Sequence, residues 1–319
     1  MLEYTSISEL CQAAQEQGVS LSQLVLADQA QQMELSPQQL LDNMQHRFTV
    51  MQEAVQAGLD PELHSTSGLT GGDGARLWRY AQSGGITGAF LNRAIARAVA
   101  VAEYNAAMGK IVAAPTAGSC GILPGTVVSM VEEERCSRDA GVMALFTAGA
   151  VGMVIAQKAC IAGAQGGCQA ECGSAAAMAA AALVELQGGS PAQAAHACAI
   201  ALKNQLGLVC DPVAGLVEIP CIKRNVGGVV IAFSSAEMAL AGVESKIPVD
   251  ECIQAMGAVG ESMPCSLRET AQGGLAATPT GQAMRRAVFG DEPYPSALPL
   301  LLSVYRLYQC RQTIRGYLS

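Results

Sequence analysis

The chain has 319 residues and a formal net charge of -8; half of its residues are hydrophobic and only 14% are charged. This length suffices for one large or two modest domains with a sizeable core. The one small basic cluster, Lys223 and Arg224, is far from the basic face that nucleic-acid binding requires, so we expect no nucleic-acid partner.

The first part of the chain, residues 6 to 58, has the pattern of helices. Ser36-Pro37-Gln38-Gln39 provides an N-cap, a proline at the first helical position and a glutamine at N3, and Gly58 is expected just past the helix end. Between these signals the apolar residues recur at helical spacing: Leu40, Leu41, Met44, Phe48, Met51 and Val55.

From residue 65 onward, glycine-rich loops (65–75, 114–126, 162–174 and 270–281) alternate with alanine-rich helices. A second capping pattern, Ser190-Pro191-Ala192-Gln193, predicts a helix to about Gln205, whereas Gly227 to Phe233 has the composition of a strand. We therefore predict an all-α fold of closely packed Gly/Ala-rich helices with little strand. In this prediction residues 1–290 form a single domain, in which the N-terminal helices of residues 1–60 pack on the rest. Residues 291–319 form a helical tail.

One charge-free stretch, Ala140 to Gln157, is nearly long enough to span a bilayer. Its alanine, glycine, valine and methionine content favours a buried core helix over a membrane span. The N-terminus shows no pattern of a secretory signal, so we expect a cytoplasmic protein that is not in a membrane. In that compartment the twelve cysteines are not expected to form disulfides.

Three cysteines stand where the backbone is expected to turn. Cys168 lies in GGCQAE, Cys210 precedes Asp-Pro, and Cys221 follows a proline and should open a helix, a position that favours the thiolate. Taken singly, each could equally be a small core residue. Cys160, Cys198 and Cys252 lie in helical patterns and are interpreted as core. Cys168 and Cys172 form the nearest approach to a close ligand pair, and without a second such pair a structural zinc site is not predicted.

Several longer motifs occur together along the chain. In this combination and order they resemble the α subunit of the iron–sulfur-dependent bacterial L-serine dehydratases, over most of the chain. The motifs are SGLTGGD (67–73), NAAMG (105–109), PTAGSCGILPG (115–125), GGCQAE (166–171), KNQLGLVCDPVAGLVEIPCIKRN (203–225) and LRETAQGGLAATPTG (267–281).

The resemblance implies that Cys168, Cys210 and Cys221 hold a [4Fe-4S] cluster, with residues 1–290 as the catalytic domain. Three protein ligands leave one iron open, and an open iron is a Lewis acid. The implied reaction is the elimination of the hydroxyl of L-serine to give pyruvate and ammonia. Cys172, Cys120 and Cys265 lie in or near these motifs, but the resemblance does not make them ligands.

Backbone N–H groups in two glycine-rich loops are expected to bind the substrate carboxylate. The candidates are Ser67, Thr70 and Gly71 in one loop, and Thr116, Gly118 and Ser119 in the other. Tight helix packing explains the same glycines equally well, so both interpretations stay open.

The general base is harder to assign. Of the three histidines, His46 and His196 fall within helical patterns, which leaves His64 as the candidate. The resemblance also implies a β subunit that carries further histidines, so the base could come from that partner in a hetero-oligomer; a homodimer is the other expectation. A further hypothesis is that Cys310 of the tail occupies the open iron when substrate is absent.

Four other functions remain open. A pyridoxal-phosphate dehydratase would need a lysine beside a phosphate loop in an α/β fold, and none of the lysines lies in such a setting (Lys110, Lys158, Lys203, Lys223 and Lys246). An L-cysteine desulfidase would use a similar open iron. A structural or sensory cluster protein would use the same three ligands, and a transporter would require insolubility without detergent.

Overall fold

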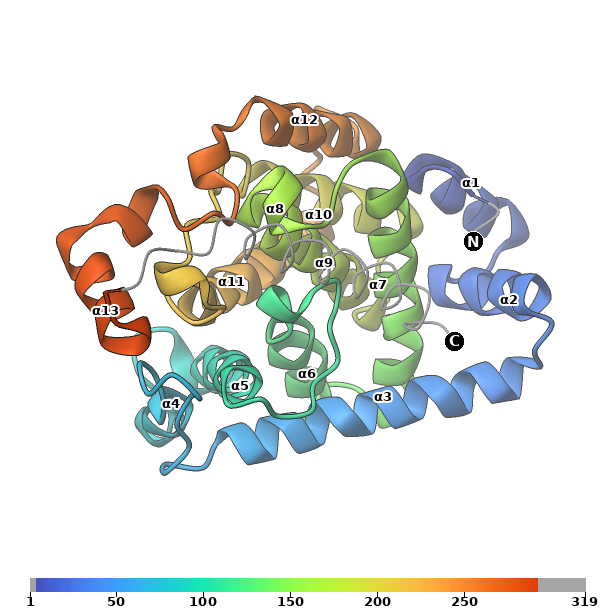
Figure 1. Ribbon diagram of the computed structural model, residues 1–319. Helices are drawn as coiled ribbons and strands as arrows, with labels where there is room; N and C mark the ends of the chain where they lie inside the picture. The colour runs from blue at the N-terminus through green and yellow to red at the C-terminus, as the bar shows by residue number, and fades with distance from the viewer. Residues whose placement is uncertain (1–3, 292–319) are drawn as a thin grey trace.

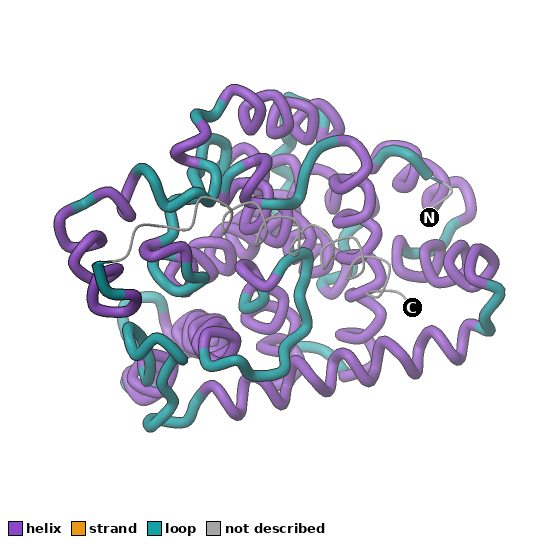
Figure 2. Tube along the Cα trace, in the orientation of Figure 1, coloured by secondary structure: helices purple, strands orange, loops and turns teal. Residues whose placement is uncertain are grey.

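The computed structural model describes residues 4–291, and this part of the chain is built from helices (Figures 1 and 2). In this described part, thirteen α-helices are joined by loops and by short 3-10 and π-helical turns. Within residues 4–291 there is no β-strand, and the one isolated bridge pairs Cys210 with Arg268. The all-α prediction is confirmed, and the alternating β/α units that a pyridoxal-phosphate dehydratase would show are missing from this range. The predicted tail, with Cys310, lies outside the described residues.

The helices follow one another in chain order with these bounds: α1 Ile7–Gln17, α2 Leu21–Met33, α3 Pro37–Gly58, α4 Asp73–Ala81, α5 Gly88–Ala106, α6 Ser129–Glu132, α7 Arg138–Lys158, α8 Gly163–Gly166, α9 Ser174–Leu186, α10 Pro191–Lys203, α11 Cys221–Leu240, α12 Val249–Ser262 and α13 Pro279–Phe289.

Helix α9 is the centre of the fold, and it packs against α7, α10 and α11 (Figure 1). Its sequence, SAAAMAAAALVEL, is buried from Ser174 to Val184. Alanine has the highest helix propensity and the smallest side chain that keeps it, so neighbouring helices can approach α9 from every side. The close packing expected from the Gly/Ala composition is therefore found here.

Helix α7 contains the charge-free stretch. It is the one helix within residues 4–291 that is long and apolar enough to cross a membrane, and 78% of its most apolar window is buried inside the fold. Its neighbours are α9, α2 and α3. This is the environment of a core helix, as the sequence predicted.

Helix α3 runs along one side of the molecule (Figure 1). Its predicted start is confirmed, because the Ser36 side chain accepts from Gln39 N and the Gln39 side chain accepts from Ser36 N. Its end differs from the prediction by one residue. Gly58 is the last helical residue, and a Cβ there would lie 2.0 Å from the carbonyl oxygen of Ala100 on α5. The glycine permits this close helix contact rather than ending the helix.

The structure also decides the predictions for α10, for residues 227–233 and for Cys160. The capping pattern at Ser190 is confirmed, although α10 ends at Lys203, two residues earlier than expected. The predicted strand from Gly227 to Phe233 is wrong, because these residues are the middle of α11, where Gly228, Val229 and Ala232 are buried against neighbouring helices and Val230 is exposed. Cys160 lies in the loop after α7 rather than within a helix.

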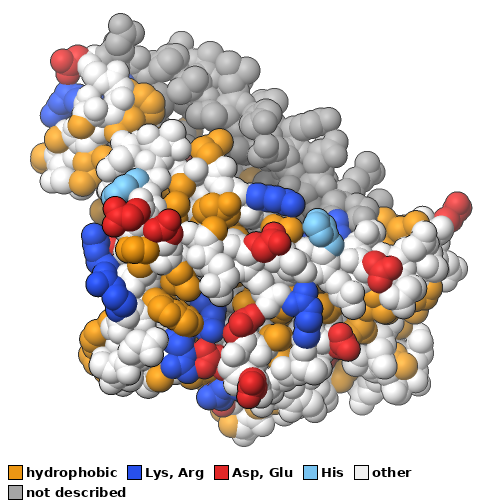
Figure 3. All heavy atoms as spheres, turned by 90° about the horizontal axis from the view of Figure 1, so that it is seen from below, with side chains coloured by type: hydrophobic (Ala, Val, Ile, Leu, Met, Phe, Trp, Pro, Cys, Tyr) orange, Lys and Arg blue, Asp and Glu red, His pale blue; other side chains and the backbone are white. Residues whose placement is uncertain are grey.

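The face on the α3 side carries both charge signs. Figure 3 views the molecule from below Figure 1, and on that face acidic and basic side chains are interspersed among hydrophobic ones. The chain as a whole has 27 acidic and 19 basic residues. Neither observation offers the single-sign basic surface that nucleic-acid binding requires.

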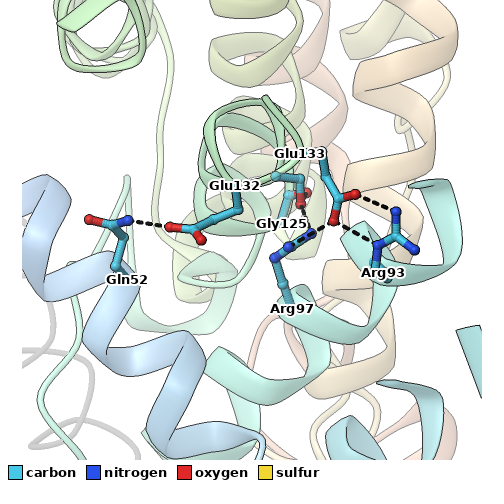
Figure 4. Close-up of polar contacts among 7 residues, drawn as sticks. Gln52, Arg93, Arg97, Gly125, Glu132 and Glu133 are labelled. Atoms are coloured by element: carbon cyan, nitrogen blue, oxygen red, sulfur yellow. Dashed lines mark hydrogen bonds and ion pairs between the residues drawn. The ribbon is translucent and has the colours of Figure 1, made fainter. Parts of the chain in front are cut away.

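A partly buried ion network joins α5 to the turn after α6 (Figure 4). Glu133 pairs with Arg93 through both carboxylate oxygens and accepts from Arg97 Nη2 at 2.9 Å. Arg97 also donates to Ser129 Oγ at 3.1 Å and lies over the ring of Trp78, 5.0 Å from its centroid. The Arg97 side chain is only 5% exposed, so this guanidinium depends on Glu133 for charge compensation.

Replacing Glu133 with glutamine should therefore destabilise the fold by about 2–3 kcal/mol at pH 7, because it leaves Arg97 buried beside a neutral side chain. Arg93, together with Arg97, holds the pKa of Glu133 below its ordinary value of 4.5. A lowered folded-state pKa gives stability that is complete above the unfolded pKa and is lost as pH falls through the folded pKa. Urea unfolding at pH 7 and at pH 4 should show the difference between wild type and E133Q shrinking at the lower pH.

The matched control is Glu244→Gln, which removes an exposed glutamate paired with Lys246. This variant should unfold like the wild type at both pH values, because exposed ion pairs contribute little. A difference between wild type and E133Q that stays constant with pH would contradict the assigned role of the Glu133 charge.

Candidate active site

The turn that carries Cys168 is fixed by the glutamine that follows it. Gln169 is fully buried; its backbone N donates to Leu208 O, its Nε2 donates to Met256 O, and its Oε1 accepts from Gly207 N, all within 3.0 Å. Gly167, with φ +74°, precedes the cysteine, and a Cβ there would lie 2.9 Å from Leu208 O. These contacts hold Cys168 beside the segment that leads to Cys210, about forty positions further along the chain.

Cys210 lies in an extended segment braced by the 267–281 motif. Its N donates to Leu267 O at 2.8 Å, and its O accepts from Glu269 N at 2.7 Å. The next residue, Asp211, accepts from Arg224 Nη2 and from Leu275 N at 2.8 and 2.7 Å. Asp211 therefore ties the cysteine both to α11 and to the C-terminal motif.

Cys221 is the first residue of α11, as predicted, and Asn225 one turn later fixes it. Asn225 is 1% exposed; its Nδ2 donates to Cys221 O and to Gly118 O, both at 2.9 Å. Its Oδ1 accepts from Gly121 N at 2.9 Å. The side-chain amide of Asn225 thus joins the start of α11, where Cys221 lies, to the 115–125 loop.

The three cysteines lie on three separate segments that hydrogen bonds join to one another. All are buried. Burial raises the pKa of the Cys210 thiol well above its ordinary value, and the charges of Glu171, Cys168 and Cys221 raise it further while Arg224 opposes them. Glu171 lies close to Cys210, because a Cβ placed at Gly163 would be 2.7 Å from Glu171 Oε2 and 3.0 Å from Cys210 Sγ. Burial thus opposes the thiolate form of Cys210, and binding a metal through this residue would release a proton.

The other cysteines from the motifs differ in placement. Cys172 is buried with its Sγ 3.4 Å from Cys168 Sγ, so it belongs to the same group of thiols. Cys120 lies in an apolar cluster with Ala54, Val55 and Val101, and Cys265 is exposed.

The two loops proposed to bind a carboxylate already bind protein carboxylates. Ser67 Oγ and Thr70 Oγ1 both donate to Glu218 Oε2, at 3.0 and 2.8 Å. Thr116 Oγ1 donates to Glu171 Oε1 at 2.8 Å. Through these contacts the structure brings both loops to the cysteine segments, since Glu171 follows Cys168 and Glu218 precedes Cys221.

The remaining residues of the two loops have mainly packing roles. Ser119 is fully buried and its Oγ lies 3.3 Å from Thr116 Oγ1. A Cβ at Gly71 would lie 2.3 Å from Leu63 O, and one at Gly118 would lie 3.2 Å from both carboxylate oxygens of Glu171. Gly71 thus supports the tight-packing interpretation, whereas Gly118 leaves room beside Glu171.

Only one of the three histidines, His64, borders these loops. His64 is exposed, at the edge of the loop where its Nδ1 approaches the Gly71 backbone. His46 is exposed on α3, and His196 Nδ1 on α10 accepts from Ser245 N at 3.2 Å. The helical positions of His46 and His196 are as predicted.

Three residues that the sequence reasoning passed over join the predicted ones: Glu171, Glu218 and Asn225. Each lies in a motif quoted for its cysteine or glycine. One feature of the sequence could have indicated the two glutamates. Each stands three positions from a candidate ligand in a segment otherwise poor in charge: Glu171 after Cys168, and Glu218 before Cys221. Within residues 4–291, no group of three or more His, Cys, Asp and Glu side chains could hold a metal ion as placed here. The thiols nevertheless suit a polynuclear cluster in donor type and in burial.

The fold and the site define an all-helical protein with buried thiols next to glycine-rich loops. The hydroxyls of these loops donate hydrogen bonds to glutamates near the thiols. The family model described as serine dehydratase alpha chain matches residues 16–276. The chain belongs to this family.

Named relatives agree with the family. The chain is 50% identical over 288 residues to the probable L-serine dehydratase alpha chain of Bacillus subtilis, covering 90% of this chain and 96% of that protein. It is 46% identical over 279 residues to the L-serine dehydratase alpha chain of Peptoniphilus asaccharolyticus, covering 87% and 96%. It is also 47% identical over 181 residues to the L-serine dehydratase of Streptomyces coelicolor, covering 56% of this chain and 40% of that longer protein.

Proposed function

We propose that this chain is the α chain of an L-serine dehydratase that converts L-serine to pyruvate and ammonia in the cytoplasm. The observation that carries the proposal is the hydrogen bonding that joins the segments of Cys168, Cys210 and Cys221 to one another, through Gln169 and Arg224. Each comes from a different segment, and each segment is fixed by buried hydrogen bonds to the others or to a neighbouring motif. If these cysteines served only as small core residues, the buried hydrogen bonds that fix their segments would not be needed.

Cys168, Cys210 and Cys221 would hold the [4Fe-4S] cluster that the family resemblance implies. When bound, a cluster with three protein ligands supplies a Lewis acid to the leaving hydroxyl. The chain's own residues position the substrate: the 65–73 and 115–121 loops lie beside the cysteines, held there by Glu218, Glu171 and Asn225.

The reaction removes the Cα proton and the β-hydroxyl of serine as the elements of water. The resulting aminoacrylate tautomerises to an imine, and water hydrolyses the imine to pyruvate and ammonia. Among the histidines only His64 borders the site loops, and its side chain is exposed. We propose that a β chain supplies the base that takes the Cα proton across a subunit interface, which is supported by the alpha chain names of the relatives.

The test is anaerobic purification with cluster reconstitution, followed by a pyruvate assay on L-serine with and without the β chain. We expect the chain alone to bind iron and sulfide but to turn over slowly, and activity to rise when the β chain is added. Exposure to air should abolish activity, because an iron without a protein ligand is open to oxidants.

Two results would contradict the proposal. Full activity of the α chain alone would remove the need for a base from the β chain. Activity that persists in air, or in protein without iron, would overturn the cluster mechanism itself.

A further inference from the structure

Glu171 occupies the space between the substrate loop and the cysteines. It lies in the π-helical turn Gln169–Gly173, three residues after Cys168, and is half-buried. Its Oε1 accepts from Thr116 Oγ1 at 2.8 Å, which aims the carboxylate along the 116–119 loop.

Two glycines leave room around this carboxylate. A Cβ at Gly118 would lie 3.2 Å from each of its oxygens. A Cβ at Gly163 would lie 2.7 Å from Glu171 Oε2 and 3.0 Å from Cys210 Sγ. A single point in space is therefore close both to the carboxylate and to a proposed cluster ligand, and any side chain at position 163 would fill it.

The proposed substrate has two charged groups of opposite sign that could lie beside the Glu171 carboxylate. L-serine at neutral pH carries a carboxylate and an α-ammonium group. A fixed carboxylate repels the first and attracts the second, most strongly where burial excludes water. Thr116 is already engaged with Glu171, so it positions this residue rather than serving as a free donor to the substrate carboxylate.

We propose that Glu171 binds the α-ammonium group of the substrate and thereby selects an amino acid over the corresponding hydroxy acid. This inference rests on the proposed function. Glu218, the other glutamate of the site, is less suited to the role, because it is only 4% exposed whereas Glu171 is half-buried. Glu171 is the more accessible of the two carboxylates.

The test uses Glu171→Gln in the cluster-loaded chain combined with its β chain. Glutamine keeps an oxygen that can accept from Thr116 but removes the charge. The KM for L-serine is compared with the inhibition constant of 3-hydroxypropanoate, which has the same carboxylate and hydroxyl but no ammonium. If turnover is too slow for kinetics, calorimetry measures the binding of both compounds. Iron content and the visible and electron paramagnetic resonance spectra report the cluster independently of activity.

We expect L-serine to bind roughly 10- to 100-fold more weakly to E171Q, as for the loss of one charge-assisted hydrogen bond. The binding of 3-hydroxypropanoate and the cluster spectra should be unchanged. The matched control is Glu185→Gln: Glu185 also accepts from a threonine hydroxyl, Thr147 Oγ1 at 2.6 Å, but lies at the far end of α9. E185Q should bind both compounds like the wild type.

Equal weakening of both compounds would overturn the inference, as would unchanged binding of L-serine or loss of the cluster from E171Q. These results leave the proposed function intact as long as the wild type forms pyruvate. A wild type that forms no pyruvate from L-serine would instead mean that the proposed function has failed.

Discussion

Cys210→Ser is expected to lose the cluster and to lower serine dehydratase activity by on the order of 10²-fold or more. Even residues that only support a metal ligand cost 10- to 100-fold when mutated, and a direct ligand should cost at least as much. Cys210 is the most informative of the three cysteines, because its backbone is fixed on both sides by Leu267 and Glu269. The segment should therefore keep its path when only the sulfur is replaced. Iron and sulfide content, visible absorption and the pyruvate assay measure the effect.

Cys198→Ala is the matched control for this experiment. Cys198 is also buried and free, but it lies within α10, where its Sγ donates to Ala177 O. This variant should retain the cluster and the activity, with a modest loss of stability. If C210S keeps a full cluster, or if C198A loses it to the same degree, the proposed ligand set is wrong.

The helical architecture could be predicted from local signals, because capping residues and helical spacing act within one or two turns. Ser36 and Ser190 cap the helices that the sequence assigned to them, and Cys221 opens α11. The failures came from contacts between distant segments. Gly58 has the pattern of a helix stop, but a glycine is needed at this position because the carbonyl of Ala100 on α5 leaves no room for a side chain.

The strand predicted at Gly227 to Phe233 failed for a related reason. Valine, isoleucine and phenylalanine favour strands when one face of a sheet is available, yet this run continues the helix that begins at Cys221 and packs one side, with Val229 and Ala232, against its neighbours α9 and α5. Tertiary packing decided the conformation against the local propensity.

At the site, the sequence indicated the segments but not the partners of their side chains. The candidate hydroxyls of Ser67, Thr70 and Thr116 do lie beside the cysteine segments. Their acceptors, Glu218 and Glu171, are 148 and 55 positions away from Thr70 and Thr116 respectively. Pairings over such separations depend on the complete fold, and neither spacing nor composition reveals them.

Asn225→Asp should be the most damaging single substitution outside the cysteines. The aspartate can still accept from Gly121 N but cannot donate to Gly118 O or to Cys221 O. A carboxylate oxygen would then face two carbonyl oxygens in a site that is 1% exposed. We expect a loss of about 2–5 kcal/mol in the free energy of unfolding, from two lost hydrogen bonds and a buried charge.

Function should suffer in addition, because the same amide joins the 115–125 loop to the helix that carries Cys221. Cluster affinity is expected to fall on the order of 10- to 100-fold, as for other residues that hold a metal ligand in place. Urea unfolding of the metal-free chain and iron retention during dialysis measure the two effects separately. Asn204→Asp is the control: Asn204 Nδ2 donates to the helix carbonyl four residues earlier, as Asn225 does to Cys221, but Asn204 is exposed. N204D should cost less than about 1 kcal/mol and leave the cluster unaffected. If N225D loses stability but retains iron like the wild type, Asn225 supports the fold alone and the loop does not position the cysteine.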